Sequence, residues 1–300
     1  MRKIIYYVIV LLLIFVGIFL YFYFNKNSNS ISTNQTGEKI KIAATIFPVY
    51  DIARNIVGDK IQVIQVVPPG ASPHTFEVSP KTATELQGVK AIFKIGNGLD
   101  DWIDGVAQSG APDAPIFILS QGIDLRRFSD GSVDPHYWLA LNNAQTIAKN
   151  IFQDILEIDP ANKDYYQNNL DAYLIKLDVA DKKISATLAN VSQKNIAVFH
   201  DAWYYFTQRY GLNVVTAFEP FPGKEPTPQY LSQFINDIKK YNLKVVFIEP
   251  QFSAQSLEQI AKDQGVNLVL INPADGGSSG NDDLITLLEN DAQIMASVLK

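Results

Sequence analysis

The chain has 300 residues, of which 47% are hydrophobic and 19% charged, so it can form about two domains with sizeable cores. Its formal net charge of -6 at pH 7 argues against a nucleic-acid partner, because phosphate binding needs clustered Lys and Arg. The lack of cysteine excludes disulfides, thiolate metal sites, cysteine nucleophiles and cysteine-linked lipid anchors, so any metal must be held by nitrogen and oxygen ligands.

The N-terminal 38 residues predict a membrane segment followed by a tether. Residues 4–24 carry no charge and follow the basic Arg2 and Lys3; at ~1.5 Å per residue they span a hydrocarbon core of ~30 Å. A cleaved signal segment is the alternative, but the run is long, ends in aromatic residues and has no small-residue cleavage site after it. We predict an uncleaved transmembrane anchor within residues 1–24, with a cytoplasmic N-terminus, and a flexible polar tether over residues 25–38.

From residue 39 onward, apolar runs typical of strands alternate with helical segments. Strands are predicted at residues 40–46, 61–67, 91–95 and 116–119, with the second one expected to be buried. Helices are predicted at residues 49–57, from 80, near 101–106 and, after an irregular loop over 121–135, at 143–158. This alternation predicts an N-terminal α/β lobe over residues 39–158, with a parallel sheet and helices on both of its faces.

Asp159 and Pro160 predict the start of a long helix, as N-cap and first helical residue. The helical pattern continues to about Leu188, and ~30 residues at ~1.5 Å each give ~45 Å, enough to pass along both halves of the chain. Its apolar stripe consists of Tyr165, Leu170, Tyr173, Leu174, Leu177, Ile184 and Leu188. We assign residues 159–193 to a helix that joins the two lobes.

The second half of the chain repeats the architecture of the first. Strands are predicted at residues 195–199, 214–218, 244–248 and 266–271, and helices at 202–210, 228–241, 253–263 and 282–299. Residues 194–300 are therefore predicted to form a C-terminal α/β lobe, and the fold class is α/β with two parallel-sheet lobes.

The chain has three histidines, and each lies at the edge of a predicted element. His74 lies in a stiff loop rich in proline after the second strand, His136 ends the loop over residues 121–135, and His200 ends a strand. In open α/β sheets, ligands bind outside the carboxyl ends of the strands, where Asp275 follows the last strand. Three imidazoles and one carboxylate form a site that suits Zn²⁺ best, while Mn²⁺ prefers more oxygen ligands and is the alternative.

Each of these residues has a plainer explanation when it is taken alone. A single histidine in a loop is more often solvated or a helix cap than a metal ligand. Asp134 and Asp201 are possible N-caps, Glu249 a cap or a surface ion-pair partner, and Asp275 a turn residue. The spacing of these residues leaves both readings open.

Several motifs, taken in order, resemble the cluster A-I metal-binding solute-binding proteins of ABC importers, the ZnuA/TroA-like family of zinc and manganese uptake. The similarity covers residues 39–300 and rests on ATIFPVYD at 44–51, SPHTFE at 72–77, GNGLDDW at 96–102, DPHYWL at 134–139, FHDAW at 199–203, EPT at 225–227 and FIEP at 247–250. The chain lacks the lipobox cysteine of many members, and we expect the N-terminal anchor to replace it.

The resemblance implies two lobes joined by one long rigid helix, and a metal ion bound between the lobes. It implies His74, His136 and His200 as ligands, and a histidine at the third position goes with zinc in the family. The NPAD sequence at 272–275 resembles the Asn-Pro-Leu-Glu form of some zinc members, which makes Asp275 the expected fourth ligand. Other members have an Asp-Pro-Leu-Gly form, and alignment with that form would make Asn272 the fourth ligand instead.

The function that the resemblance implies is capture of Zn²⁺, or less readily Mn²⁺, and its delivery to an ABC-transporter permease, without catalysis. We expect a monomer outside the cytoplasm, tethered to the outer face of the cytoplasmic membrane, or secreted or periplasmic if the N-terminal segment is cleaved. Two other classes stay open: a membrane-anchored zinc hydrolase with Asp275 or Glu249 as base, and a surface adhesin stabilised by metal.

Overall fold

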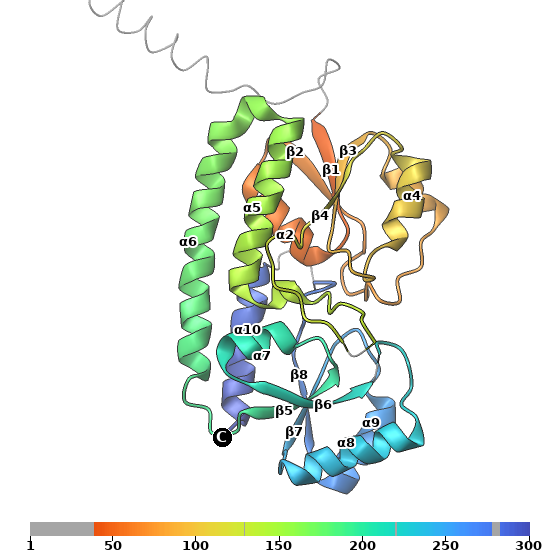
Figure 1. Cartoon of the computed structure of the whole chain (residues 1–300), viewed down its shortest axis with the longest axis vertical. Helices are drawn as coiled ribbons and strands as arrows, with labels where there is room; N and C mark the ends of the chain where they lie inside the picture. The colour runs from red at the N-terminus through yellow and green to blue at the C-terminus, as the bar shows by residue number, and fades with distance from the viewer. Residues whose placement is uncertain (1–38, 129, 220, 278–282) are drawn as a thin grey trace, which may run out of the picture. The chain divides into compact units, whose positions relative to one another are not determined.

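The structure is a computed structural model that describes residues 39–128, 130–219, 221–277 and 283–300 (Figure 1). Residues Ile40–Lys300 form one compact unit, which is the subject here. The predicted anchor and tether, residues 1–38, lie outside the described residues. In the ranges that are described, we find no helix of the length and apolar character that crossing a membrane requires.

Within the unit Ile40–Lys300, the described residues form two parallel sheets of four strands each, and these eight strands were predicted from the sequence. The first sheet has the order β2-β1-β3-β4, with β1 Ile40–Ala44, β2 Ile61–Gln65, β3 Val89–Lys94 and β4 Ile116–Ile118. The second has the order β6-β5-β7-β8, with β5 Asn195–His200, β6 Asn213–Glu219, β7 Val245–Ile248 and β8 Asn267–Leu270. The two orders are equivalent, as expected if the second half repeats the first. We call each sheet with the helices packed on it a lobe.

The first sheet is covered by helices on both faces, as predicted. The helices of this lobe are α2 Phe47–Val57, α3 Pro80–Glu85, α4 Trp102–Gly110 and α5 Leu141–Ile158. Ile42 and Phe93 pack into the main core with α2 and α5, whereas Ala43 and Ile92 pack on the opposite face with α3 and α4. Successive residues of a strand point to opposite faces, so each strand contributes to both cores.

The second sheet is built in the same way. Its helices are α7 Tyr204–Tyr210, α8 Pro228–Lys240, α9 Gln255–Gln264 and α10 Leu284–Val298. Ala197 and Phe199 pack with α8 and α9, while Ile196 and Val198 belong to the main core together with residues of α7 and α10. The main core therefore runs through both lobes.

The long linking helix is α6, Lys163–Leu188, which lies beside α5 and α10 (Figure 1). Its 26 residues give ~39 Å of helix, and it contacts α2 and α5 of the first lobe as well as α7 and α10 of the second. Its buried residues are Tyr166, Leu170, Tyr173, Leu177, Ala180, Asp181, Ile184 and Leu188. Tyr165 and Leu174, two members of the predicted stripe, are only partly buried.

This helix begins later than predicted. Residues Pro160–Asn162 form a 3₁₀ turn, η2, and the α-helix starts at Lys163. The Asp159 carboxylate does not cap a backbone N–H; it accepts hydrogen bonds from the Asn162 amide at 2.8 Å and the Tyr166 hydroxyl at 2.6 Å. Asp159 thus anchors the first turn through side chains.

The prediction that the strand after α2 is buried is wrong for most of β2. This strand lies at the edge of its sheet and pairs with β1 alone among the described strands. Gln62 is exposed and Val63 and Ile64 are partly exposed, while Ile61 is buried. An apolar run alone does not distinguish an edge strand from a central one.

Candidate metal centre

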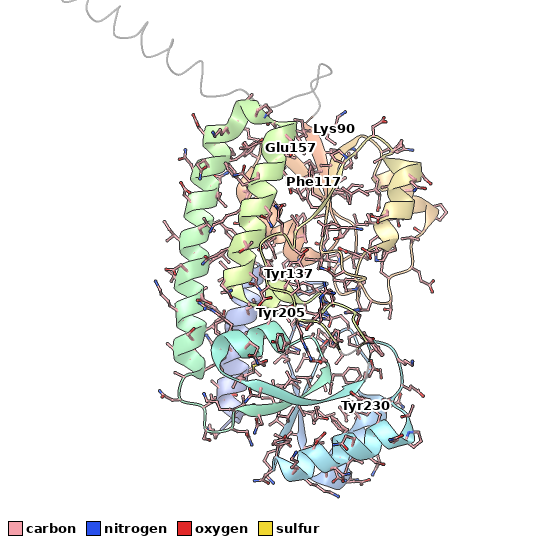
Figure 2. The ribbon with its side chains drawn as sticks, viewed as in Figure 1. Lys90, Phe117, Tyr137, Glu157, Tyr205 and Tyr230 are labelled. Carbon is pink, nitrogen blue, oxygen red and sulfur yellow. The ribbon has the colours of Figure 1, made fainter. Side chains whose placement is uncertain are left out.

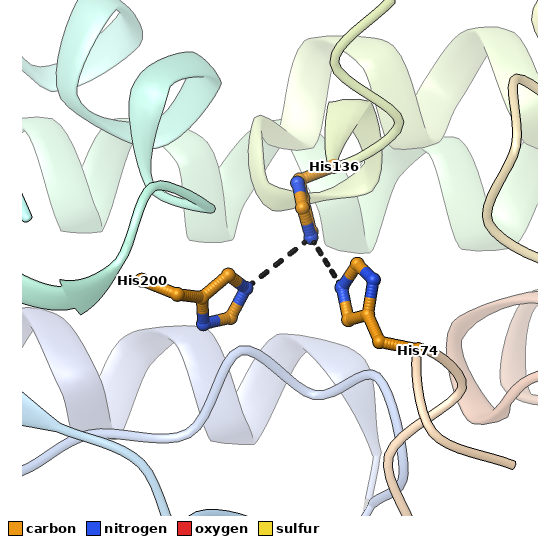
Figure 3. Close-up of side chains that lie close together, drawn as sticks. All are labelled: His74, His136 and His200. Carbon is orange, nitrogen blue, oxygen red and sulfur yellow. Dashed lines mark hydrogen bonds between the residues drawn. The ribbon is translucent and has the colours of Figure 1, made fainter. Parts of the chain in front are cut away.

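The three histidines come together at the carboxyl ends of the strands, as the sequence predicted. His74 lies in the loop after β2, His136 immediately before the short helix η1 Tyr137–Leu139, and His200 is the last residue of β5. One ring nitrogen of each lies within 4.8 Å of the other two, and Figure 3 shows the three rings converging. The first lobe supplies two of the rings and the second lobe supplies one.

The distances between these nitrogens fit shared coordination of one cation. His136 Nε2 lies 3.0 Å from His74 Nε2 and 3.4 Å from His200 Nε2. Zinc–nitrogen bonds of ~2.0–2.1 Å in a tetrahedron put neighbouring nitrogens about 3.3 Å apart. A single ion can therefore bind all three with little movement of the rings.

The ring of His136 is oriented by Asp134. Its Nδ1 lies 2.8 Å from Asp134 Oδ1, which also accepts the backbone N–H of His136 at 3.1 Å. Asp134 is fully buried and does not cap η1, which has no side-chain cap. The carboxylate favours the ring proton on Nδ1 and leaves the Nε2 lone pair facing the other histidines.

Glu249, at the end of β7, has the equivalent position beside His200. His200 is 1% exposed, and its Nδ1 lies 2.8 Å from Glu249 Oε2, although the angles are not those of a hydrogen bond. Burial disfavours the charged ring, but the carboxylates of Glu249, Asp275 and Asp201 together outweigh this and raise the pKa of His200. Trp203 Nε1 donates to Glu249 Oε1 at 3.3 Å and holds the carboxylate in place.

His74 is the least buried of the three rings. Burial, followed by the neighbouring His136 and His200, lowers the pKa of His74 well below its ordinary value. This ring is therefore neutral at neutral pH, which is the form of imidazole that binds a cation.

Asp275 lies in the same buried region, 1% exposed, after β8. Its Oδ1 accepts hydrogen bonds from Gln251 Nε2 and, at 2.9 Å, from the Gly276 N–H, while its Oδ2 is buried and accepts none from the described residues. Burial and, after it, the nearby Glu249 carboxylate raise the pKa of Asp275 to about 7. In the part of the chain that is described, the group of mutually close ligand atoms contains the histidines but not Asp275.

Asn272, the alternative fourth ligand, is engaged in a turn. Its Oδ1 accepts the Ala274 N–H at 2.9 Å, and its own backbone N–H donates to Asp291 Oδ1 at 3.0 Å. Its side-chain oxygen is thus satisfied within its own loop, in contrast to the unpaired carboxylate oxygen of Asp275.

The segment that carries Asp275 leaves the second sheet and is bonded to the first lobe. Phe47 N–H donates to the backbone oxygen of Asp275 at 3.2 Å, and Trp138 Nε1 donates to the backbone oxygen of Pro273 at 2.8 Å. Phe47 begins α2 and Trp138 lies in η1, so both donors belong to the first lobe.

Two glycines allow this close docking. Gly70 N–H donates to the Gly276 oxygen at 3.2 Å, and a Cβ on Gly276 would lie 2.4 Å from the backbone oxygen of Ala71. A Cβ on Gly277, which has φ +66°, would lie 2.9 Å from the ring of Phe47. The loop of Asp275 and the loop of His74 therefore touch along their backbones.

Asp201 and Arg126 have a role that the sequence did not reveal. Asp201 is not the N-cap that the sequence offered: it binds Arg126 Nη2 at 2.7 Å, and α7 has no side-chain cap. Arg126 was not singled out from the sequence. The available signal in the sequence was an aspartate close to each of two histidines, Asp134 two residues before His136 and Asp201 directly after His200.

A cavity of about 650 Å³ opens beside the histidines. All three histidines line it, together with Arg126, Asp201 and Tyr230, the last of which is labelled in Figure 2. It is far larger than a bare ion, and residues of both lobes line it.

Comparison with known proteins gives one consistent family. A sequence profile described as the periplasmic zinc-uptake complex component A, ZnuA, matches residues 42–298. The high-affinity zinc uptake system protein ZnuA of Bacillus subtilis (strain 168) is 28% identical over 267 residues, which cover 84% of each chain. The manganese ABC transporter substrate-binding lipoprotein PsaA of Streptococcus anginosus is 28% identical over 243 residues, covering 77% of this chain and 79% of its own length.

Solved structures agree with this assignment. A crystal structure of ZnuA is 31% identical, has a TM-score of 0.79, and covers 88% of this chain and 100% of its own. The profile extends across both sheets and the linking helix, and the relatives are solute-binding components rather than enzymes. The chain therefore belongs to the family of metal-binding solute-binding proteins of ABC importers.

Proposed function

We propose that this protein captures Zn²⁺ outside the cytoplasm, between its two lobes, and delivers it to the permease of an ABC importer. His74, His136 and His200 are the proposed nitrogen ligands, and Asp275 supplies the fourth ligand through a small movement of its loop. The N-terminal segment, if it is retained, tethers the protein as a monomer to the outer face of the cytoplasmic membrane.

The observation that carries this proposal is the convergence of three Nε2 atoms within a buried region. Carboxylates beside the Nδ1 atoms of His136 and His200 direct the Nε2 lone pairs of both rings toward each other, 3.4 Å apart. Lone pairs at this separation repel each other unless a proton or a cation lies between them. A cation bound by all three nitrogens satisfies the whole group at once.

The chemistry of the ligands supports zinc as the cargo. Three imidazoles and one carboxylate form a four-coordinate shell typical of Zn²⁺, whereas Mn²⁺ is better served by a shell with more oxygen. The relatives serve different metals, zinc for the ZnuA of Bacillus subtilis and manganese for the PsaA of Streptococcus anginosus, so the family alone does not decide. The histidine at position 200 supports zinc in this chain.

A competitive titration of residues 39–300 with Zn²⁺ and Mn²⁺, together with elemental analysis of the purified protein, tests the proposal. We expect one Zn²⁺ per chain, with an affinity well above that for Mn²⁺. His136→Ala should abolish tight binding, because it removes the nitrogen that lies between the other two. Tighter binding of Mn²⁺, or tight binding of Zn²⁺ that survives His136→Ala, would contradict the proposed cargo or site.

A further inference from the structure

A single arginine connects the surroundings of two of the proposed ligands across the lobes. Arg126 lies in the first lobe, between β4 and η1, and its guanidinium donates to both carboxylate oxygens of Asp201, at 3.1 and 2.7 Å. Asp201 follows His200 directly in the second lobe. This two-pronged contact is the geometry in which arginine binds a carboxylate most specifically.

The same guanidinium also contacts the carboxylate that orients His136. Arg126 Nη1 donates to Asp134 Oδ2 at 3.2 Å, while the other oxygen of Asp134 holds the ring of His136. One positive group therefore lies between two carboxylates, one beside each histidine loop. Asp134 is fully buried, so the arginine also supplies the counter-charge that this carboxylate needs.

Aromatic side chains hold Arg126 in this position. Its guanidinium carbon lies 4.6 Å from the ring centre of Phe128 and 4.4 Å from that of Tyr204, a residue of the second lobe. The hydroxyl of Tyr205, labelled in Figure 2, accepts the Arg126 backbone N–H at 2.9 Å and donates to the Asp134 backbone oxygen at 2.9 Å. The side chain and the backbone of Arg126 are therefore both held against α7.

We propose that Arg126 is a positioning residue that latches the two lobes together and thereby sets how long the ion stays bound. This inference rests on the proposed function, because it concerns the same site. The latch joins the loop of His136 to the loop of His200, and it forms when the two lobes are together. Loss of the latch therefore speeds the release of the ion more than it slows its capture.

The test measures Zn²⁺ release by stopped flow into excess chelator, and Zn²⁺ association separately, on residues 39–300. Arg126→Gln should release zinc about 10-fold faster, at the lower end of the effects seen when partners of metal ligands are removed, with little change in association. Arg126→Lys keeps the charge but not the two-pronged contact and should give an intermediate rate. It also serves as the second variant should Arg126→Gln not fold.

Arg127→Gln is the matched control, because the Arg127 side chain donates only to the nearby Gly131 oxygen, at 3.3 Å, among the hydrogen bonds of the described residues. Its release rate should equal that of the wild type. In an Asp201→Asn background, Arg126→Gln should have much less effect, since its partner is already weakened. Equal release by Arg126→Gln and wild type, or an undiminished effect in the Asp201→Asn background, overturns the latch.

These results also separate the inference from the proposed function. A wild-type protein that binds no Zn²⁺ contradicts the function itself. A wild-type protein that binds Zn²⁺ tightly and releases it at the same rate as Arg126→Gln contradicts only the role of Arg126.

Discussion

At the scale of single residues, buried carboxylates decide how the histidines are presented. Asp134 and Glu249 lie on the far side of the rings of His136 and His200, so each ring directs its other nitrogen to the centre. The sequence predicted that the three histidines come together, because each lies at the edge of a predicted element. It did not predict which carboxylate orients which ring, because that depends on side-chain directions within the loops.

The fourth ligand can be tested by substitution of the two candidates. Asp275 has a buried oxygen that accepts no hydrogen bond from the described residues, whereas the side-chain oxygen of Asn272 is already bonded. Asp275→Asn should weaken Zn²⁺ binding about 10- to 100-fold, because an amide oxygen replaces a charged one. Asn272→Ala should leave the affinity within a few fold. Competitive titration with a fluorescent chelator measures the Zn²⁺ affinity of both variants. A larger loss of affinity for Asn272→Ala than for Asp275→Asn would identify Asn272 as the fourth ligand instead.

At the scale of elements, the pattern of apolar residues and turn residues predicted the strands and most of the helix boundaries. It did not predict the contacts between side chains around the site. Ser79 caps α3 through the Thr82 N–H, in keeping with a serine that directly precedes a proline at the first helical position. The contact between Arg126 and Asp201 spans 75 residues, and no local pattern predicts such a pair. The predicted start of α6 was wrong because the Asp159 carboxylate binds side chains rather than a backbone N–H.

The docking of the Asp275 loop on the His74 loop predicts a strong effect of one added methyl group. In Gly276→Ala the new Cβ would meet the backbone oxygen of Ala71 at 2.4 Å, and a backbone atom cannot move aside as a flexible side chain can. The two loops must separate, so we expect a clear loss of Zn²⁺ affinity with the helical content unchanged, measured by titration and circular dichroism.

Gly105→Ala is the control for this substitution. A Cβ on Gly105, within α4, meets nothing within 4 Å, and alanine favours the helix. This variant should keep the wild-type affinity and gain about 0.4–1 kcal/mol of stability. Normal zinc binding by Gly276→Ala would show that contact between the two loops is dispensable.

At the scale of the whole molecule, the cores do not depend on the ion. The main hydrophobic core passes through both lobes and α6, and two further clusters lie on the outer faces of the sheets. This arrangement favours a protein that stays folded when empty over one whose fold needs a structural metal.

Metal removal should therefore lower the melting temperature without unfolding the protein. Free Zn²⁺ at 100 times its dissociation constant adds about 2.7 kcal/mol of stability, which corresponds to a rise of about 5–10 °C for a domain of this size. Differential scanning calorimetry with chelator and with zinc measures this shift. Unfolding at 25 °C on addition of chelator would instead favour a structural role for the metal.

The path of the chain after β8 divides the proposed ligands unevenly between the lobes. Asp275 comes from the second sheet, yet its loop is fastened by hydrogen bonds to Phe47 and Trp138 of the first. Three of the four proposed ligands are therefore held by the first lobe, and only His200 by the second. The seam along which the lobes could separate runs between His200 and the other three side chains. With the proposed ligands, opening along that seam would break one metal bond and leave the cation on the three side chains that the first lobe holds.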